Sequence, residues 1–480
     1  MITKAVAIAA AFLRFGGDML ERVNEFLWSV PVLGLILVTG VWLTGITGFV
    51  QVRLFPAAVR EFWHRLRDRD SGFRALCTAL AATVGTGNIA GVAGAIAIGG
   101  PGAVFWMWVS AFFGMAVKLA ESVLAVRYRE ADGRAGPMYV IEKGLGKRWR
   151  FLGYAYSFFG IAAAFGVGNA AQVNAVVTVL DGAGGLWFGV VLAIVVGWMV
   201  MGGARKIAGA AEVLVPVVGG AYILLCLAAL VLCRERLGEA LASILRGAFD
   251  PRAVTGGVLG SMMGTLRIGV SRGTFTNEAG MGTAAIAHGT SDSEPVAQGL
   301  MGIMEVFLDT IVICTLTALV ILTSCISIPY GTQAGSELTA AALSVSLGPW
   351  VRAALCGFLV LFALATILGW SFYAGRCAEF LFGRISWKWF GFCQGGAVLL
   401  GLFLKTGTVW TMAELFNGLM AIPNLAALLM LSGEVKSLLT VDILSAGVVS
   451  SRRGDTNEKN HHLSDPGADA AVRLSDAPGH

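Results

Sequence analysis

The stretch TVGTGNIAG, from Thr83 to Gly91, places polar groups and a weak helix inside an apolar run over residues 75–98. Two glycines beside a threonine and an asparagine weaken the hydrogen bonds of a helix, and lipid offers no replacement partners. Such backbone persists at membrane depth only where it is buried in protein or lines a cavity. Its freed carbonyl oxygens can ligate a small cation, and its freed N–H groups can hold a carboxylate. This chemistry favours a transporter over a passive membrane anchor.

A second helix, expected over residues 151–180, carries uncharged polar side chains at depth. Asn169 and Gln172 lie three residues apart and therefore share one helical face, and Phe165 lies close to them in the sequence. Amides in a lipid-spanning helix must point at protein or water. A hydrogen bond between helices and a hydrogen bond to a small polar ligand satisfy them equally well, so Phe165 and Gln172 are candidate pocket residues.

A third helix, expected over residues 350–375, places a threonine and a tryptophan one turn apart. The Thr366 hydroxyl is a hard oxygen suited to Na⁺, and the Trp370 indole could cover a small pocket. The routine alternatives are a hydrogen bond from the threonine to its own helix and a packing role for the tryptophan.

Charged residues inside membrane segments are candidates for function because they are costly there. Five of them form an expected inner gate held by ion pairs: Arg267, Arg272, Glu278, Glu305 and Asp309. The two arginines are spaced to reach the first of these acids if the chain folds back. The other two acids lie one helical turn apart in a helix expected over residues 298–325, and either arginine or Lys118 could be their partner.

The composition places all these residues in a membrane protein. Of the 480 residues, 56% are hydrophobic and only 14% are charged, and apolar runs long enough to span a bilayer recur along the chain. The fold class expected is therefore an all-α polytopic membrane protein. Eleven membrane helices are expected, at about 29–50, 75–98, 102–127, 151–180, 186–203, 209–233, 253–273, 298–325, 350–375, 387–405 and 410–431.

The basic residues are unevenly distributed among the loops between these helices. Loops 51–74 and 127–150 are rich in arginine and lysine taken together, whereas loops 181–185 and 326–349 contain neither. The positive-inside rule then places the N-terminus outside and the C-terminal tail in the cytoplasm. Segment 234–252 disagrees, because it holds four arginines on the outer side. We interpret it as an external amphipathic helix.

Three regions follow from this pattern. An amphipathic surface segment is expected over 1–28, a transmembrane transporter domain over 29–435, and a polar, disordered cytoplasmic tail over 436–480. The leading residues lack the layout of a signal peptide, since charged residues interrupt their apolar stretch.

Without the leading helix, the ten remaining helices divide into two sets of five. An odd number of helices in each half inverts the second half, which is the plan of many secondary transporters. The helices that open the two halves, 75–98 and 253–273, are both rich in glycine. Interrupted helices at corresponding positions mark a binding site, although close packing through small residues explains the glycines equally well.

Several other functions lack their sequence features. The chain has no G-x-x-x-x-G-K-[ST] motif for ATP, and Gly85-Thr86-Gly87 lacks the βαβ setting of a dinucleotide site. The five histidines, three of them in the tail, form no haem or zinc pattern, and no nucleophile–base pair indicates an enzyme. The eight cysteines form no C-x-x-C pair and are expected to be small buried residues. A channel is disfavoured because it needs a continuous polar path.

Four blocks of the sequence resemble the alanine or glycine:cation symporter family, in the family's order and across most of residues 30–435. They are TVGTGNIAGVAGAIAIGGPGAVFW (83–106), GPMY (136–139) with IEKGLG (141–146), the segment 272–282 with AIAH (285–288), and ILGWS (367–371). The resemblance implies a LeuT-type 5+5 inverted repeat with one extra N-terminal transmembrane helix. It also implies Na⁺-coupled, sometimes H⁺-coupled, uptake of alanine or glycine.

The resemblance assigns roles to individual residues. Backbone donors to the substrate carboxylate would come from the first broken helix, at Thr83, Gly85, Thr86, Gly87 and Asn88. The pocket and its facing helix would be lined by Gln172, Gly260, Met263, Gly264 and Trp370. Thr366 would join carbonyls near Ala82 at a sodium site. Ala365 departs from the family, which often has a hydroxyl residue there, so the proton is the alternative coupling ion.

The expected function is therefore cation-coupled symport of small neutral amino acids by alternating access in the cell inner membrane, with Na⁺ as the coupling ion. The alternative is proton-coupled transport of another small amino acid such as serine. The expected partners are the amino acid, Na⁺ and the lipid bilayer, with no cofactor, ATP or nucleic acid. The sequence leaves the oligomeric state open.

Overall fold

The computed structural model describes residues 19–28, 31–180, 182–258, 261–403 and 406–441, and all the regular structure within these ranges is helical. The first helices are α2 (Pro31–Ile46), α3 (Val50–Arg53), α4 (Phe55–Asp68), α5 (Ser71–Thr83), η1 (Gly87–Gly91), α6 (Val92–Gly99), α7 (Gly102–Arg127), α8 (Pro137–Val140), η2 (Ile141–Leu145), η3 (Lys147–Trp149), α9 (Arg150–Ala163), η4 (Ala164–Ala170) and α10 (Ala171–Leu180). The next are α11 (Gly182–Met201), α12 (Gly203–Leu232), η5 (Arg234–Arg236), α13 (Leu237–Phe249), α14 (Pro251–Thr255), α15 (Met262–Asn277) and α16 (Thr283–His288). The last are α17 (Pro295–Val306), η6 (Phe307–Cys314), α18 (Thr315–Thr323), α19 (Ser336–Leu347), α20 (Val351–Phe382), α21 (Trp387–Gly401) and α22 (Thr406–Met430).

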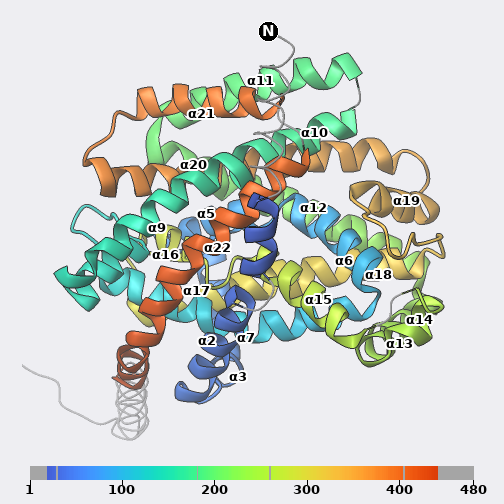
Figure 1. Cartoon of the computed structure of the whole chain (residues 1–480), viewed down its shortest axis with the longest axis horizontal. Coiled ribbons are helices and arrows are strands. Elements are labelled where there is room, and N and C mark those ends of the chain that lie inside the picture. The colour runs from blue at the N-terminus through green and yellow to red at the C-terminus, as the bar shows by residue number, and fades with distance from the viewer. Residues whose placement is uncertain (1–18, 29–30, 181, 259–260, 404–405, 442–480) are drawn as a thin grey trace, which may run out of the picture.

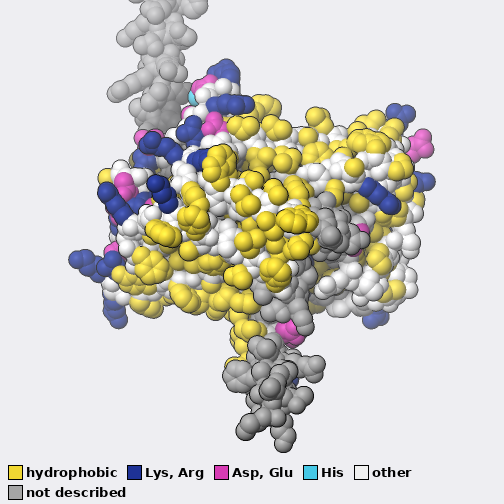
Figure 2. Space-filling view, turned by 90° about the horizontal axis from the view of Figure 1, so that it is seen from above, with side chains coloured by type: hydrophobic (Ala, Val, Ile, Leu, Met, Phe, Trp, Pro, Cys, Tyr) yellow, Lys and Arg dark blue, Asp and Glu magenta, His cyan; other side chains and the backbone are white. Residues whose placement is uncertain are grey.

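The helices confirm an all-α membrane architecture but not the count of eleven spans. Six helices of the described residues are long and apolar enough to cross a membrane, and there are eight spans if each of two bent pairs is one. Other expected spans correspond to shorter helices, such as α15 with 16 residues and α21 with 15. Figure 2 shows apolar side chains over much of one face, with most lysines and arginines toward its borders.

The leading helix packs on the transporter core instead of standing apart from it. Helix α2 lies against α7 and α22, and a Cβ atom at Gly40 would approach Phe113 Cβ to 2.8 Å (Figure 1). The Trp42 indole donates a 3.0 Å hydrogen bond to Ser432. Within the expected surface segment, residues 19–28 form a helix, and its Trp28 donates to the Glu414 carbonyl. Residues 1–18 and the tail from 442 lie outside the described part.

The region expected as loop 51–74 is largely helical. Helix α4 spaces Phe55, Val59 and Phe62 three and four residues apart, so it presents an apolar face, and it packs on α17. Its basic residues suggested a loop, but they occupy the opposite face, except for Arg65, which is buried. Segment 234–252 is helical as expected, mainly as α13.

The core that holds the site is built around two helices. Helix α7 packs on α15 and α17, and α5 packs on α12 and α20. Figure 1 shows α5, α7, α15 and α17 close to the centre of the molecule. The segments that follow α5 and α15 are both irregular, and they meet there.

Candidate functional site

The first interruption follows α5, which ends at Thr83. Helical hydrogen bonding resumes at Gly87, and the helices on the two sides meet at 52°. The Asn88 side-chain oxygen accepts a 2.8 Å hydrogen bond from the Gly85 N–H, which satisfies one amide that the break frees. A Cβ atom at residue 85 would lie 2.6 Å from Thr366 Oγ1, so glycine allows a close approach of the break to α20. The expected break in this stretch is confirmed.

The second interruption separates α15 from α16. The backbone has positive φ at Glu278 (53°), Gly280 (89°) and Gly282 (80°), which ends one helix and redirects the chain into the next. Glu121 of α7 reaches into this turn, and its Oε1 accepts from the N–H groups of Gly280 (3.1 Å) and Gly282 (3.0 Å). The same oxygen accepts from Asn424 Nδ2 at 2.7 Å. One buried carboxylate therefore satisfies the amides of the second break.

A small cavity lies between the two breaks. It is lined by Ala82, Thr83, Gly85, Thr86, Gly87, Val167, Gln172, Phe275, Thr276, Glu278 and Thr366. Eight of these residues were singled out in the sequence. The cavity volume is about 20 Å³, so the cavity can hold about one water molecule. The conformation is therefore contracted, and an amino acid can enter only if the surrounding elements move apart.

The expectation for the facing helix needs correction. Gly256 and Gly257 have positive φ, but they end the short helix α14 before α15 begins. Met263 is 63% exposed and Gly264 is also exposed, at the opposite end of α15 from the cavity. Phe275, the first residue of α15 that lines the cavity, lies eleven positions after Gly264, or roughly 16 Å along the helix. Gly260 lies outside the described residues.

Two asparagines tie both breaks to the π-helical segment η6. Asn88 Nδ2 donates to Asp309 Oδ1 at 2.7 Å. In the second break, Asn277 Oδ1 accepts from the Ala279 N–H at 3.0 Å, and its Nδ2 donates to Thr310 Oγ1 at 3.2 Å. The Thr310 hydroxyl in turn donates to Asp309 Oδ2 at 2.8 Å. The Asp309 carboxylate is fully buried and has no ion-pair partner among the described residues. The expectation that it belongs to an ion-paired gate is therefore corrected. It anchors both breaks through hydrogen bonds.

Of the remaining pocket candidates, Gln172 lines the cavity, Trp370 lies behind its lining and Phe165 lies outside it. Gln172 Oε1 accepts a 3.0 Å hydrogen bond from Thr86 Oγ1, so these two expected residues do meet. Trp370 is fully buried, and its Cβ atom fills the space beside Gly168, behind the cavity lining. Phe165 is 39% exposed and does not line the cavity. It lies in η4, whose wider π-helical turns rotate it away from the face that α-helical spacing predicts.

The expected gate between the arginines and the acids is not assembled. Arg267 is exposed and Arg272 is half-buried, and neither makes an ion pair within the described residues. Helix α15 continues past both arginines to Asn277, so the chain does not fold back where the spacing suggested. Of the expected partners of Glu305, Lys118 is the one that pairs with it, at 2.8 Å between Oε1 and Nζ, and both side chains are fully buried.

Two glycines of the first broken helix make a matched test of the close contact with α20. Gly85→Ala should lower the rate of alanine uptake roughly tenfold or more, because the new methyl group must displace Thr366. Gly91→Ala is the control, since a Cβ atom there has no neighbour within 4 Å among the described atoms. Initial uptake rates in proteoliposomes compare the two. Equal rates for both variants would show that the contact with Thr366 is not needed.

Two broken helices that face one another across a small polar cavity, in an all-helical apolar chain, define a secondary transporter of the inverted-repeat class. Residues 14–442 match the sodium:alanine symporter family, and the chain belongs to that family. It is therefore a transporter and not an enzyme.

Named relatives cover nearly the same length. The sodium/alanine symporter AgcS of Methanococcus maripaludis is 41% identical over 437 residues, which cover 88% of this chain and 96% of that protein. The probable sodium/glutamine symporter GlnT of Bacillus subtilis is 38% identical over 87% of this chain and 88% of its own. Among solved structures, MhsT in complex with L-phenylalanine has a TM-score of 0.54 at 18% identity, and the match covers 78% of this chain and 98% of that one. That match shows a shared fold.

Proposed function

We propose that the protein is a Na⁺-coupled symporter of small neutral amino acids, with alanine or glycine as substrate. The observation that carries the proposal is the cavity where both broken helices meet, lined by Gly85, Thr86, Glu278 and Thr366. The backbone of the first break can donate to a substrate carboxylate. The Glu278 carboxyl, whose Oε2 has no hydrogen-bond partner among the described residues, can accept from the substrate ammonium. The relative AgcS is a sodium/alanine symporter, which supports a substrate with a short side chain.

The buried charges support coupling to a cation. Four carboxyl groups of the described residues are buried, at Glu121, Glu278, Glu305 and Asp309. The buried basic side chains are Lys118, His288 and Arg65, and Arg65 pairs with Glu61 and Asp70 instead of with these four acids. Buried carboxylates in excess of their cationic partners attract a metal cation or a proton, because unpaired charge is costly away from water. A cation that enters together with the amino acid lowers this cost.

We place the sodium ligands at Thr366 and the carbonyl region of Ala82. Thr366 Oγ1 is buried and has no hydrogen-bond partner among the described residues, so its oxygen is free to ligate an ion. A Cβ atom at Gly369, one turn along α20, would lie 2.9 Å from the Ala82 backbone N. Helix α20 therefore comes very close to α5 beside the threonine. The absence of a hydroxyl at Ala365 leaves the remaining ligands to backbone oxygens.

Removal of the Thr366 hydroxyl should weaken the dependence on sodium. Thr366→Val keeps the shape of the side chain, and it should raise the Na⁺ concentration for half-maximal uptake about tenfold, since one ligand oxygen is lost. Thr366→Ser keeps the oxygen and should stay within about threefold of the parent protein. Uptake measured over a series of Na⁺ concentrations gives both values. An unchanged half-maximal concentration in Thr366→Val would remove this residue from the sodium site.

The basic segments indicate how the protein is oriented in the membrane, and the broken helices indicate how the transport cycle would run. The basic residues of segments 51–74 and 127–150 favour a cytoplasmic location for α4 and for the end of α7, in the cell inner membrane, with the N-terminus outside. Opening would alternate between the two sides as the broken helices move against the rest of the bundle.

Uptake of labelled L-alanine into proteoliposomes tests the proposal. An inward Na⁺ gradient should drive accumulation, and unlabelled glycine should compete better than glutamine. Accumulation driven by a proton gradient alone would favour the alternative of a proton-coupled transporter, with the buried Asp309 carboxyl as the proton carrier. No uptake of alanine or glycine under either gradient would contradict the proposed substrate class.

A further inference from the structure

A buried histidine lies outside the cavity, in a chain of polar side chains that leads toward α4. His288, at the end of α16, has Nε2 3.0 Å from Glu305 Oε2 and Nδ1 2.6 Å from Gln298 Nε2. Gln298 Oε1 lies 3.4 Å from Arg65 Nη1. Each of these four side chains is at most 4% exposed. This series of side chains connects the buried ion pair of Glu305 and Lys118 to Arg65 of α4.

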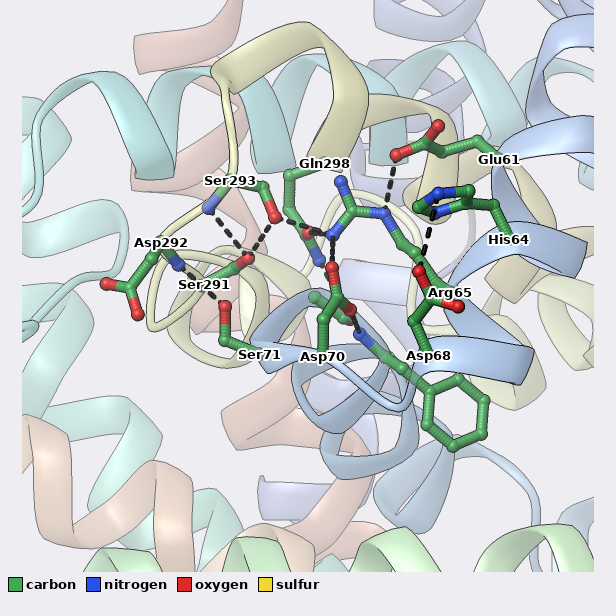
Figure 3. A network of polar contacts seen from close by, with 12 residues as sticks. Glu61, His64, Arg65, Asp68, Asp70, Ser71, Ser291, Asp292, Ser293 and Gln298 are labelled. Atoms are coloured by element: carbon green, nitrogen blue, oxygen red, sulfur yellow. Dashed lines mark hydrogen bonds and ion pairs between the residues drawn. The ribbon is translucent and has the colours of Figure 1, made fainter.

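Arg65 is the point where three segments are held together (Figure 3). Its Nε is 2.7 Å from Glu61 Oε1, and its Nη1 is 3.1 Å from Asp70 Oδ2 and 2.5 Å from Ser293 Oγ. Asp70 is the N-cap of α5, where its Oδ1 accepts from the Phe73 N–H at 2.8 Å. The guanidinium therefore joins the start of α5 to Gln298 of α17 and to the loop before that helix.

The start of α5 has room for this arginine only because residue 72 is glycine. A Cβ atom at Gly72 would lie 1.5 Å from Arg65 Nη1 and 2.8 Å from Gln298 Oε1. The Gly72 carbonyl also accepts a 3.4 Å hydrogen bond from Gln298 Nε2. The Gln298 amide is thus held from two sides, by a donor and by an acceptor.

These contacts fix where the proton of His288 lies. A guanidinium only donates, so the Gln298 oxygen must face Arg65, and a carbonyl only accepts, so the Gln298 nitrogen must face Gly72. The same nitrogen then donates to His288 Nδ1, which must be unprotonated. The single ring proton is on Nε2 and is donated to Glu305. In this arrangement the imidazole is neutral.

We propose that His288 is a proton-binding site that controls the inner half-helix α5, because a proton taken up on Nδ1 turns the Gln298 amide, which then loses its hydrogen bonds with Arg65 and with Gly72. Protonated Nδ1 is a donor, and it faces the NH₂ group of Gln298, which is also a donor. If the amide turns to offer its oxygen to His288, its NH₂ group faces the guanidinium of Arg65, and its contact with Gly72 is lost. The two contacts by which Gln298 of α17 holds Arg65 and the start of α5 are then lost, whereas Arg65 keeps Glu61, Asp70 and Ser293.

Other titratable side chains lie on the elements that pack against α16, and these could also respond to pH. The elements packed on α16 are α5, α7, α8, α17 and α20. The titratable and charged side chains of these elements are Arg74, Cys77, Lys118, Glu121, Arg127, Tyr139, Glu305, Arg352, Cys356, Tyr373, Arg376, Cys377 and Glu379, and the turn before α16 adds Glu278. Only Glu305 among them contacts the imidazole within the described residues. Histidine side chains ordinarily change charge between pH 5 and 8, which sets the pH range of the test.

The role given to His288 rests on the proposed transport cycle, because α5 lines the cavity and would move when the cytoplasmic side opens. A neutral His288 holds α5 against α17, and acid in the cytoplasm would loosen this contact. The test itself needs neither sodium nor an amino acid, so it is independent of the proposed substrate.

Hydrogen–deuterium exchange of the purified full chain in lipid nanodiscs tests the switch. After correction for the chemical exchange rate, the amides of α5 should open about tenfold more often at pH 6 than at pH 8, as expected for the loss of one or two hydrogen bonds. His288→Gln should remove this difference, because its side chain does not titrate. His64→Gln is the matched control: this histidine of α4 is 59% exposed and pairs with Asp68, and the variant should behave like the parent protein (Figure 3).

A second variant keeps the histidine in place. Gln298→Glu offers a carboxylate that can accept from Arg65 and from protonated His288 at the same time, so it should also remove the pH difference. A pH difference that persists in either His288→Gln or Gln298→Glu, or that is absent from the parent protein, would overturn the proposal. Sodium-driven alanine uptake measured on the same preparations at pH 8 tests the proposed function separately.

Discussion

Replacement of Asp309 by alanine is expected to abolish sodium-driven alanine uptake. The substitution removes the acceptor of Asn88 Nδ2 and of Thr310 Oγ1, and through Thr310 it loosens Asn277. A hydrogen bond to a charged group contributes about 1.5–3 kcal/mol, so the loss of two corresponds to at least about a 100-fold loss in the population of the assembled site. Asn88 Nδ2 keeps only the Asp309 backbone carbonyl at 3.2 Å and Cys314 Sγ at 3.3 Å. Uptake rate and thermal unfolding of the purified variant measure the effect.

Two variants separate the charge of Asp309 from its hydrogen bonds. Asp309→Asn keeps one acceptor oxygen but removes the charge, so the protein should fold and lose its stimulation by Na⁺. Asp292→Asn makes the same chemical change on a side chain that is 89% exposed, and it should transport normally. If Asp309→Asn shows the sodium dependence of the parent protein, the carboxylate charge has no part in coupling.

Replacement of Glu121 by alanine should have an effect of similar size through the second break. Glu121 Oε1 accepts from the N–H groups of Gly280 and Gly282 and from Asn424 Nδ2. Without it the two backbone donors would be buried without an acceptor, whereas Asn424 Nδ2 keeps the Gly280 carbonyl at 2.9 Å. At about 1–3 kcal/mol for each donor, we expect loss of uptake and a clear fall in thermal stability. The measurement is again uptake together with the unfolding temperature.

Glu121→Gln distinguishes hydrogen bonding from charge at this position. Its side-chain oxygen can replace Oε1 at all three donors, and Oε2 of the parent residue has no hydrogen-bond partner among the described residues. This variant should therefore retain the stability of the parent protein and at least about a third of its uptake. A glutamine variant as unstable as the alanine variant would show that the turn depends on the negative charge.

The sequence was sufficient to locate the first broken helix. The residues that weaken it, Gly85 and Gly87, and the residue that caps it, Asn88, are within four positions of one another, so local composition carries the signal. The meeting of this break with Gln172 and Thr366 was also expected, because polar side chains in apolar helices must face the interior.

The second break was misplaced for a physical reason. Glycine density favoured residues 256–264, but Gly256 and Gly257 end a short helix, and the interruption at the cavity is the Glu278–Gly282 turn. The signal that could have found it is Asn277 followed by Gly280 and Gly282, which matches the Gly85, Gly87 and Asn88 of the first break in composition. The role of Asp309 could not be found locally, since Asn88 is 221 residues away in the chain.

Equilibrium binding of labelled L-alanine to the purified protein, with and without Na⁺, tests the central claim most directly. If the cavity between the breaks holds both ligands, Na⁺ should raise the affinity for alanine about tenfold, and alanine should raise the affinity for Na⁺ by the same factor. Thr366→Val should reduce this coupling. Alanine binding that is equally tight with and without Na⁺, or that is absent in both, would contradict the account.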